Sequence, residues 1–415
     1  MFQRIRTLQK EYPTQYWLLF WGMLISSAGI SLIWPFLTIY LREKLTLPLT
    51  TIAALITISS IATLVSSLLI GPVMDRFGRK IVMVVSLILS AVIFSLMNYA
   101  QTFPQFVILM ALRGAFAPLY SVAADAMVAD LIEEKKRAEA YSLLRIINNV
   151  GIALGPAIGG FITSESYTAA FLLGSSSLAI FGLLVILTMR ETAPTLVNRA
   201  SPIKQDSHGY SDLFKDGLFT SFCGSITLAR IMPALVFVLL SVYVKENFGI
   251  PESQYGFLMT TNAVVVVLFQ FTVTRFANRY PPLKVLAVGS LIYAIGIGSI
   301  ALGNNFWAFM ASMVVLTFGE LLIAPTGTTL ASQLAPEDQR GRYMSVYSLT
   351  VGVARGIGPI FGGALNDNIS PAAIWYGGSA AGLLAFLWFW ALYFQRRKRN
   401  EALMNPVQTS FDDAS

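Results

Sequence analysis

The sequence predicts an all-α integral membrane protein whose twelve transmembrane helices form two pseudo-symmetric six-helix bundles. Three observations support this prediction: the composition, the recurrence of long apolar segments and an internal repeat. Of the 415 residues, 55% are hydrophobic and 12% are charged, and the mean hydropathy is +0.65. A soluble domain carries about twice that charged fraction, so little of the chain remains to form one outside the membrane.

Apolar segments of about 20 residues, the length that crosses a bilayer as a helix, recur along the chain. The first six lie near 15–40, 50–70, 81–100, 105–129, 139–163 and 168–189, and the other six near 219–244, 254–275, 283–303, 306–332, 343–366 and 371–394. The first is too long for a signal peptide and precedes the charged residues 42–44 instead of a cleavage site. We expect a retained helix, bent at Pro35.

Lysine and arginine residues are distributed unequally between the two sets of connecting segments. With both termini in the cytoplasm, the outer loops hold only Arg42, Lys44 and Lys245, whereas the inner segments hold many more basic residues. This bias predicts a multi-pass protein of the plasma (inner) membrane with cytoplasmic termini. The basic residues lie at helix ends and not along one face, so we expect no nucleic-acid binding.

Two distant segments share one pattern of small residues: GIALGPAIGG at 151–160 and ARGIGPIFGG at 354–363. Pro156 and Pro359 are 203 residues apart, and the same offset aligns Arg76 with Arg279. We therefore predict an N-terminal bundle over 1–189, a polar cytoplasmic linker over 190–217, a C-terminal bundle over 218–395 and a cytoplasmic tail over 396–415. Parallel six-span repeats are typical of transporters with a substrate cavity between the halves.

The glycines of the first pattern have two possible roles. Gly151, Gly155 and Gly159 lie on one strip of a helix, where small residues let another helix approach closely. Pro156 removes a backbone donor and bends the helix. Ordinary helix packing explains these residues as well as a transport role does.

Three segments make the chain similar to the major facilitator superfamily, which implies the major facilitator fold. GPVMDRFGRK at 71–80 resembles its cytoplasmic motif between spans 2 and 3, with matches at Gly71, Asp75, Arg76, Gly78, Arg79 and Lys80. The span-5 segment resembles a frame associated with antiporters, with matches at Gly151, Gly155, Pro156, Gly159 and Gly160. FGELLIAP at 318–325 resembles the acidic span-10 segment of twelve-helix drug/proton antiporters.

The sequence departs from the family pattern at two places. Ala117 stands where the span-4 motif that begins at Arg113 has a glycine, which weakens the proton-coupling role that the resemblance implies for Arg113. In the second half, Asn278 replaces the motif aspartate, and Pro281 and Pro282 replace a glycine and an arginine. Only the first half therefore keeps the charged cytoplasmic motif.

The resemblance implies that this cytoplasmic motif is a conformational latch. Asp75 would lie beside the start of span 11, where a helix N-terminus favours a carboxylate, and Arg79 would pair with Asp130 or Asp125. The latch would hold the two halves together at the cytoplasmic face, and its predicted members are Gly71, Asp75, Arg76, Gly78, Arg79, Lys80, Asp130 and Asp125. A tight polar turn with basic anchors is the simpler alternative.

Charged residues within the predicted spans mark the candidate coupling site. Glu320 is the one acid well inside a span, and the bases are Arg113, Arg145, Arg230 and Arg355. Ionisable groups at bilayer depth are costly, and they usually line a pathway or form pairs. Burial favours the protonated form of a carboxyl group, so we predict that Glu320 and Arg113 couple transport to protons. A static ion pair of Glu320 with Arg355 or Arg230 is the alternative.

The resemblance also implies that spans 1, 4, 7 and 10 line a central cavity. Their aromatic and methionine side chains adapt to varied apolar ligands, which favours a lipophilic substrate over a sugar. The predicted lining residues are Trp34, Met110, Phe116, Tyr120, Phe237, Met313 and Phe318.

Missing motifs disfavour several other functions. The chain has no phosphate-binding loop that would indicate ATP drive, Cys223 is its only cysteine, and His208, its only histidine, lies in the predicted linker. We therefore expect no enzymatic activity, no cofactor and no metal site. We predict a monomeric secondary transporter, embedded in lipid, that exports lipophilic drug-like compounds in exchange for protons. A facilitator or proton symporter for a small metabolite, such as a sugar or an organic acid, is the alternative.

Overall fold

The structure is a computed structural model that describes residues 11–193, 215–336 and 339–404. In these residues, twelve helical segments are long and apolar enough to cross a membrane. The first half contains α2 Thr14–Ser31, the 3-10 helix η1 Trp34–Phe36, α3 Leu37–Leu45, α4 Leu49–Phe77, α5 Arg79–Tyr99, α6 Phe103–Leu131, α7 Glu134–Glu165 and α8 Tyr167–Thr188. The second contains α10 Gly217–Phe248, α11 Glu252–Ala277, α12 Pro282–Ile300, α13 Phe306–Leu334, α14 Arg340–Asn368 and α15 Ala373–Met404.

These boundaries agree with the predicted spans in number and order, with two refinements. The first span is interrupted by η1, whose second residue is the Pro35 that was expected to bend it. Helix α15 continues to Met404, so residues 396–404 of the predicted tail are helical. His208 and most of the predicted linker lie outside the described residues.

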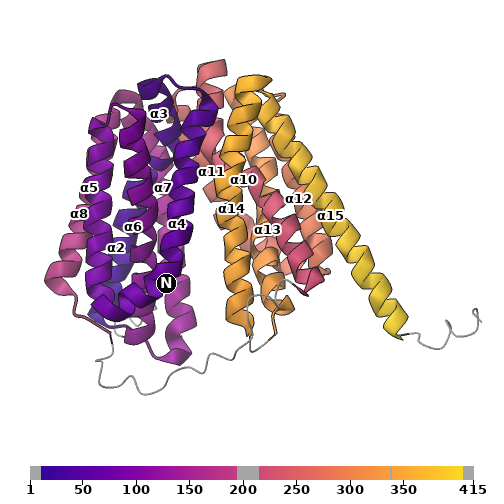
Figure 1. Ribbon diagram of the computed structural model, residues 1–415, viewed down its shortest axis with the longest axis horizontal. Helices are drawn as coiled ribbons and strands as arrows, with labels where there is room; N and C mark the ends of the chain where they lie inside the picture. The colour runs from indigo at the N-terminus through magenta and orange to yellow at the C-terminus, as the bar shows by residue number, and fades with distance from the viewer. Residues whose placement is uncertain (1–10, 194–214, 337–338, 405–415) are drawn as a thin grey trace, which may run out of the picture.

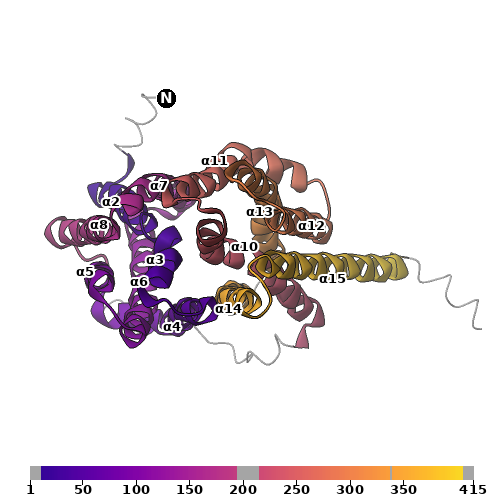
Figure 2. The ribbon, with the colours of Figure 1, turned by 90° about the horizontal axis from the view of Figure 1, so that it is seen from above.

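The helices form two groups that meet along two seams (Figures 1 and 2). Helix α4 packs against α14, and α7 packs against α11, whereas the other large contacts lie within one half. We call the side where α8 ends and α10 begins the linker side, and the opposite side, where α3 ends, the far side. Figure 1 shows the two groups close together on the far side and separated on the linker side.

Equivalent glycines in the two halves pack against equivalent residues. A Cβ atom on Gly155 of α7 would lie 2.2 Å from the Cβ of Ser31 in α2, and one on Gly358 of α14 would lie 3.1 Å from the Cβ of Ala234 in α10. Gly155 and Gly358 are 203 residues apart in the sequence, and so are Ser31 and Ala234. The offset of 203 residues that predicted the repeat therefore also relates this helix–helix contact in the first half to its counterpart in the second half, as pseudo-twofold symmetry requires.

The same relation holds across the seams between the halves. A Cβ atom on Gly160 would lie 2.5 Å from the backbone oxygen of Glu252 at the start of α11, and one on Gly363 would lie 2.7 Å from the Cα of Thr50 at the start of α4. No side chain fits at either position without moving the helices apart. These two glycines bring the two halves into contact on the far side.

Candidate functional site

A cavity of ≈ 500 Å³ lies between the two halves. Its volume is in the range of small-molecule sites. Residues from η1, α4, α6, α10, α13 and α14 line it: Trp34, Ile56, Ser59, Ser60, Thr63, Leu64, Arg113, Ala117, Pro118, Arg230, Pro233, Ala234, Phe237, Val238, Glu320, Val351, Gly352 and Arg355.

Arg113 of α6 is held in this wall by neutral partners. Its guanidinium carbon lies 3.8 Å from the ring centroid of Trp34, a cation–π contact. Its Nη1 lies 3.5 Å from the hydroxyl of Ser59 in α4, to which it donates a long hydrogen bond. Among the described residues, no carboxylate forms a salt bridge with this guanidinium.

Glu320 of α13 faces the same cavity, where an amide holds its carboxylate. Its Oε2 accepts a hydrogen bond of 2.8 Å from Nδ2 of Asn262 in α11, which also lies 3.0 Å from the hydroxyl of Thr317. In the described part of the chain, no salt bridge joins Glu320 to a base, so the static ion pair that we considered does not form here. Arg230 instead donates a hydrogen bond of 3.3 Å to the hydroxyl of Tyr347.

No motif in the sequence marks Asn262, although the repeat contains a signal for it. Asn262 lies 203 residues after Ser59, so the polar partners of Glu320 and Arg113 occupy equivalent positions in the two halves. Applying the offset to polar residues within spans would have found this pair.

If Glu320 couples transport to protons, as the sequence predicts, Asn262→Leu should lower proton-driven transport about tenfold, because a hydrogen bond to a charged group contributes about 1.5–3 kcal/mol. Leucine has a similar volume, so the helix should still pack. Proton-driven flux in proteoliposomes measures the effect. Gln270→Leu is the matched control, since Gln270 lies on the same helix and bonds Thr274 and the backbone of Leu321, outside the cavity wall. Equal flux in the two variants would contradict the role of Asn262.

Of the seven aromatic and methionine residues predicted to line the cavity, only Trp34 and Phe237 do so, again 203 residues apart. The other five were wrongly assigned to the lining, because span number alone does not say which face of a helix turns inward. Met110 and Met313 are in the packed core, Phe116 packs against it, Tyr120 lies edge-on to Phe181, and Phe318 packs on Phe269. Arg145, one of the bases within the predicted spans, has an exposed side chain on α7.

The cytoplasmic motif residues make contacts within the first half. The Nε of Arg79 lies 3.0 Å from Oδ2 of Asp130, so the pair is with Asp130, whereas Asp125 accepts a hydrogen bond through its backbone oxygen from Tyr141. The ammonium of Lys80 donates to the backbone oxygen of Ile186 at 2.9 Å. These contacts tie α5 to α6 and α8.

The turn between α4 and α5 depends on a glycine. Gly78 has φ +83°, a left-handed conformation that glycine adopts readily. A Cβ atom there would lie 2.4 Å from Oε2 of Glu191, whose carboxylate accepts the backbone N–H groups of Arg79 and Lys80 at 3.0 Å each. Asp75 and Arg76 are exposed at the end of α4, and a Cβ atom on Gly71 would meet nothing within 4 Å. This end of α4 is therefore loosely packed.

The glycine frame of span 5 serves both packing and the contact between halves. Gly151 and Gly159, like Gly155, lie against α2, where a Cβ atom would approach Ser27 and Leu32 within 2.3 Å. The backbone oxygen of Pro156 faces Gly256 of α11 in the other half, and Gly160 faces Glu252 at the start of the same helix. The packing role that we considered is thus present, and it extends across the seam.

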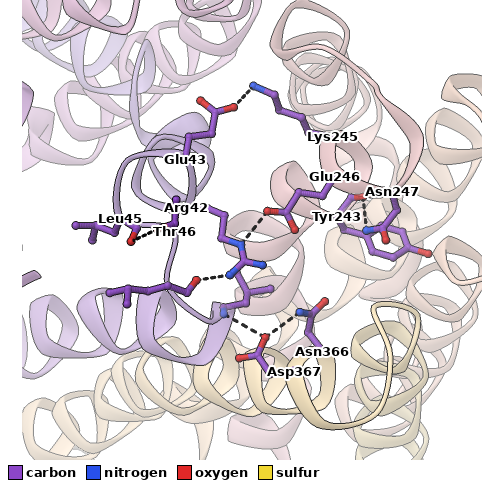
Figure 3. Close-up of polar contacts among 12 residues, drawn as sticks. Arg42, Glu43, Leu45, Thr46, Tyr243, Lys245, Glu246, Asn247, Asn366 and Asp367 are labelled. Atoms are coloured by element: carbon purple, nitrogen blue, oxygen red, sulfur yellow. Dashed lines mark hydrogen bonds and ion pairs between the residues drawn. The ribbon is translucent and has the colours of Figure 1, made fainter.

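On the far side, four charged residues link the halves reciprocally (Figure 3). The Nε of Arg42 lies 2.8 Å from Oε1 of Glu246, and the ammonium of Lys245 lies 2.5 Å from Oε1 of Glu43. Arg42 and Lys245 are 203 residues apart, as are Glu43 and Glu246. Each half therefore supplies one base and one acid, and each base pairs with the acid of the other half.

Two further acids strengthen this far-side cluster. Glu252, 5% exposed, accepts hydrogen bonds from Lys245 at 2.5 Å and from the hydroxyl of Tyr167 at 2.7 Å. Asp367 at the end of α14 accepts the backbone N–H groups of Leu49 and Thr50 at 3.1 and 2.8 Å, and so caps α4 from the other half. A carboxylate at a helix N-terminus satisfies otherwise unpaired donors.

We expect Asp367→Ala to open the far side more often, because a lost helix cap costs about 0.5–2 kcal/mol. The ratio of far-side-open to far-side-closed molecules should rise roughly 2- to 30-fold. Distances between spin labels on Glu165 and Asn368, the exposed ends of α7 and α14, report this ratio once Cys223 is replaced by Ser. Asp367→Asn keeps one acceptor oxygen and should have a smaller effect. An unchanged distance distribution in Asp367→Ala would exclude a gating role for the cap.

The structure thus defines a class of protein: a polytopic membrane protein with two related six-helix bundles and a cavity between them, the architecture of secondary transporters. The sequence model of the Major Facilitator Superfamily matches residues 19–238 and 224–409. The chain belongs to this superfamily.

Relatives and solved structures agree with this assignment. The chain is 28% identical to the MFS-type transporter YttB of Bacillus subtilis, over 85% of this chain and 88% of the relative. It is 27% identical to a Na(+), Li(+), K(+)/H(+) antiporter of Planococcus maritimus, over 91% and 96% of the two chains. The crystal structure of the nucleoside transporter NupG superposes with a TM-score of 0.79 at 15% identity, over 92% and 99% of the two chains, which shows the shared fold.

Proposed function

We propose that this chain is a proton-coupled secondary transporter that exports lipophilic small molecules by alternating access, with Glu320 as the proton site. One observation carries the proposal: Glu320 is the only acid among the residues that line the cavity between the halves. A carboxylate at this depth is costly unless it serves a pathway. Here the carboxylate accepts a hydrogen bond from an amide and, among the described residues, forms no salt bridge, so it is available to a proton.

Two alternating states follow from this proposal. If the positive-inside bias sets the orientation, the linker side is cytoplasmic and the described state is open toward the cytoplasm. The far-side cluster then closes the outer end. In the opposite state this cluster separates, and the first-half motif around Asp75 and Arg79 acts as the latch that closes the cytoplasmic end.

The direction of transport is inferred from relatives and from the span-5 frame. One relative is named as a cation/proton antiporter, and the quinolone resistance protein NorA of Staphylococcus aureus is 23% identical over 90% of this chain and 96% of the relative. The glycine frame at 151–160 resembles that of antiporters. These observations favour export in exchange for protons.

Symport of an organic acid with a proton is a second candidate, which the three arginines of the cavity favour. A negative substrate and a protonated Glu320 would stabilise each other in the same state, so the two would move together. A pH-sensitive dye inside proteoliposomes distinguishes the candidates. Substrate entering the vesicle removes internal protons in exchange, whereas it acidifies the interior in symport. A flux with no proton movement would contradict both candidates.

A further inference from the structure

The central cavity carries more positive than negative charge. Its lining contains Arg113, Arg230 and Arg355 as bases and Glu320 as the one acid. The net charge of the lining is therefore +2 with Glu320 ionised and +3 with Glu320 protonated. An uncompensated charge of this size is costly inside a bilayer.

The guanidinium group of Arg355 lies near enough to those of Arg113 and Arg230 for like charges to repel. The charge of Arg355 acts on Arg113, and that of Arg230 acts on Arg355. Among the described residues, none of the three forms a salt bridge. The described cavity wall therefore brings three like charges together, with Glu320 as its one acid and no salt bridge between that acid and any of the three arginines.

The arginines also keep donors that the protein does not use. The Nε atoms of Arg113 and Arg230 are buried and have no hydrogen-bond partner among the described residues. Arg355 is exposed on the cavity wall, and no described residue accepts a hydrogen bond from it. Guanidinium groups match the planar or tetrahedral oxygens of carboxylates and phosphates, to which they often bind in a bidentate manner.

We propose that the substrate is an amphipathic organic anion whose carboxylate or phosphate-type group binds among Arg113, Arg230 and Arg355. Its apolar body lies against Trp34, Phe237 and the aliphatic side chains of α4 and α14. This inference rests on the proposed transport function and replaces the uncharged drug-like substrate with a negatively charged one. An inside-negative membrane potential favours outward movement of such a substrate.

Binding of charge-matched probes tests this proposal. The full-length protein in phosphatidylcholine nanodiscs is titrated calorimetrically with octanoate and 2-naphthoate, with their neutral amides and with 2-naphthylmethylammonium, against empty nanodiscs. We expect at least one carboxylate to bind about tenfold or more tightly than its amide, as charge-assisted hydrogen bonds provide, and the cation to bind more weakly than both. Carboxylates that bind no more tightly than their amides would overturn the proposal.

Substitutions of the cavity arginines test whether the carboxylate binds at these residues. Arg355→Gln and Arg230→Gln should each weaken carboxylate binding about tenfold, and Arg355→Lys should retain most of it because the charge remains. Arg145→Gln, at an exposed arginine outside the cavity wall, is the matched control and should change nothing. A charge preference that survives both Arg355→Gln and Arg230→Gln would place the anion elsewhere and overturn the assignment.

Two further measurements distinguish a free anionic substrate from a bound anionic lipid, and the anion site from the proposed proton coupling. In phosphatidylglycerol nanodiscs, carboxylate binding should persist, whereas its loss would assign the arginines to an anionic lipid headgroup and overturn a free substrate. Glu320→Gln should keep the carboxylate preference. If proton-driven flux also survives in that variant, the proposed coupling fails while the anion site stands.

Discussion

Glu320→Gln is expected to abolish uphill, proton-driven transport. One pH unit contributes about 1.4 kcal/mol and a potential of 100 mV about 2.3 kcal/mol per charge. A transporter that exchanges one proton for one neutral molecule can therefore sustain a substrate gradient of roughly 500-fold, and exchange for a monoanion, which moves a second charge, can sustain one of roughly 25,000-fold. Without the titratable group we expect this ratio to fall to about one. Substrate accumulation in proteoliposomes under an imposed pH gradient and potential measures it.

This variant should still fold and bind. A glutamine oxygen can accept the hydrogen bond that Asn262 donates to Glu320. Exchange of labelled for unlabelled substrate at equal concentrations should continue, since that exchange needs no net proton movement. Glu165→Gln, an exposed acid at the end of α7, is the control and should accumulate substrate normally. If Glu320→Gln still concentrates substrate, another group carries the proton.

Gly160→Val is expected to shift the protein toward the state that is open on the far side. Even the first side-chain carbon would lie 2.5 Å from the backbone oxygen of Glu252, and the two helix backbones would have to separate. Overpacking of this kind costs about 1–3 kcal/mol, so the open-to-closed ratio should rise roughly 5- to 150-fold. The spin labels on Glu165 and Asn368 should show a longer mean distance, and transport should slow in proportion.

The chain contains its own controls for this substitution. Gly363→Val makes the equivalent clash with Thr50 and should produce the same shift. Gly217→Ala and Gly341→Ala add a methyl group where no atom lies within 4 Å, so they should leave the distances unchanged. A general loss of folding in Gly160→Val, with no shift in Gly363→Val, would argue against a gating role for these contacts.

Most of the fold could be predicted because membrane insertion imposes simple rules on the sequence. Each span needs a long apolar run, and the runs near 50–70 and 81–100 correspond to α4 and α5. The repeat was visible because Gly155, Gly159 and Gly160 and their partners in the second half are constrained by backbone contacts. A larger residue at such a contact would separate the two helices.

The site was less predictable because its geometry depends on helix rotation and on partners far apart in the sequence. Glu320 stood out as the only acid deep in a span. Met110 and Met313 lie on cavity-lining helices but face the core. The hydrogen bond from Asn262 joins residues 58 positions apart. The offset of 203 residues aligns Arg42 with Lys245 and Glu43 with Glu246, but which base pairs with which acid follows only from the packing of the two halves.

Those reciprocal pairs have the form of an isologous interface, in which residue i of one copy contacts residue j of the other and the converse contact also exists. Such an interface is what a homodimer of identical six-helix chains would form. The present chain therefore resembles a gene-fused dimer that has kept its dimer contacts at the outer rim. The cavity has diverged: Glu320 corresponds to Ala117, and Arg113 to Leu316. A strictly symmetric ancestor with one set of these residues could not have carried this unequal arrangement of charge, so the fusion allowed the two copies to specialise.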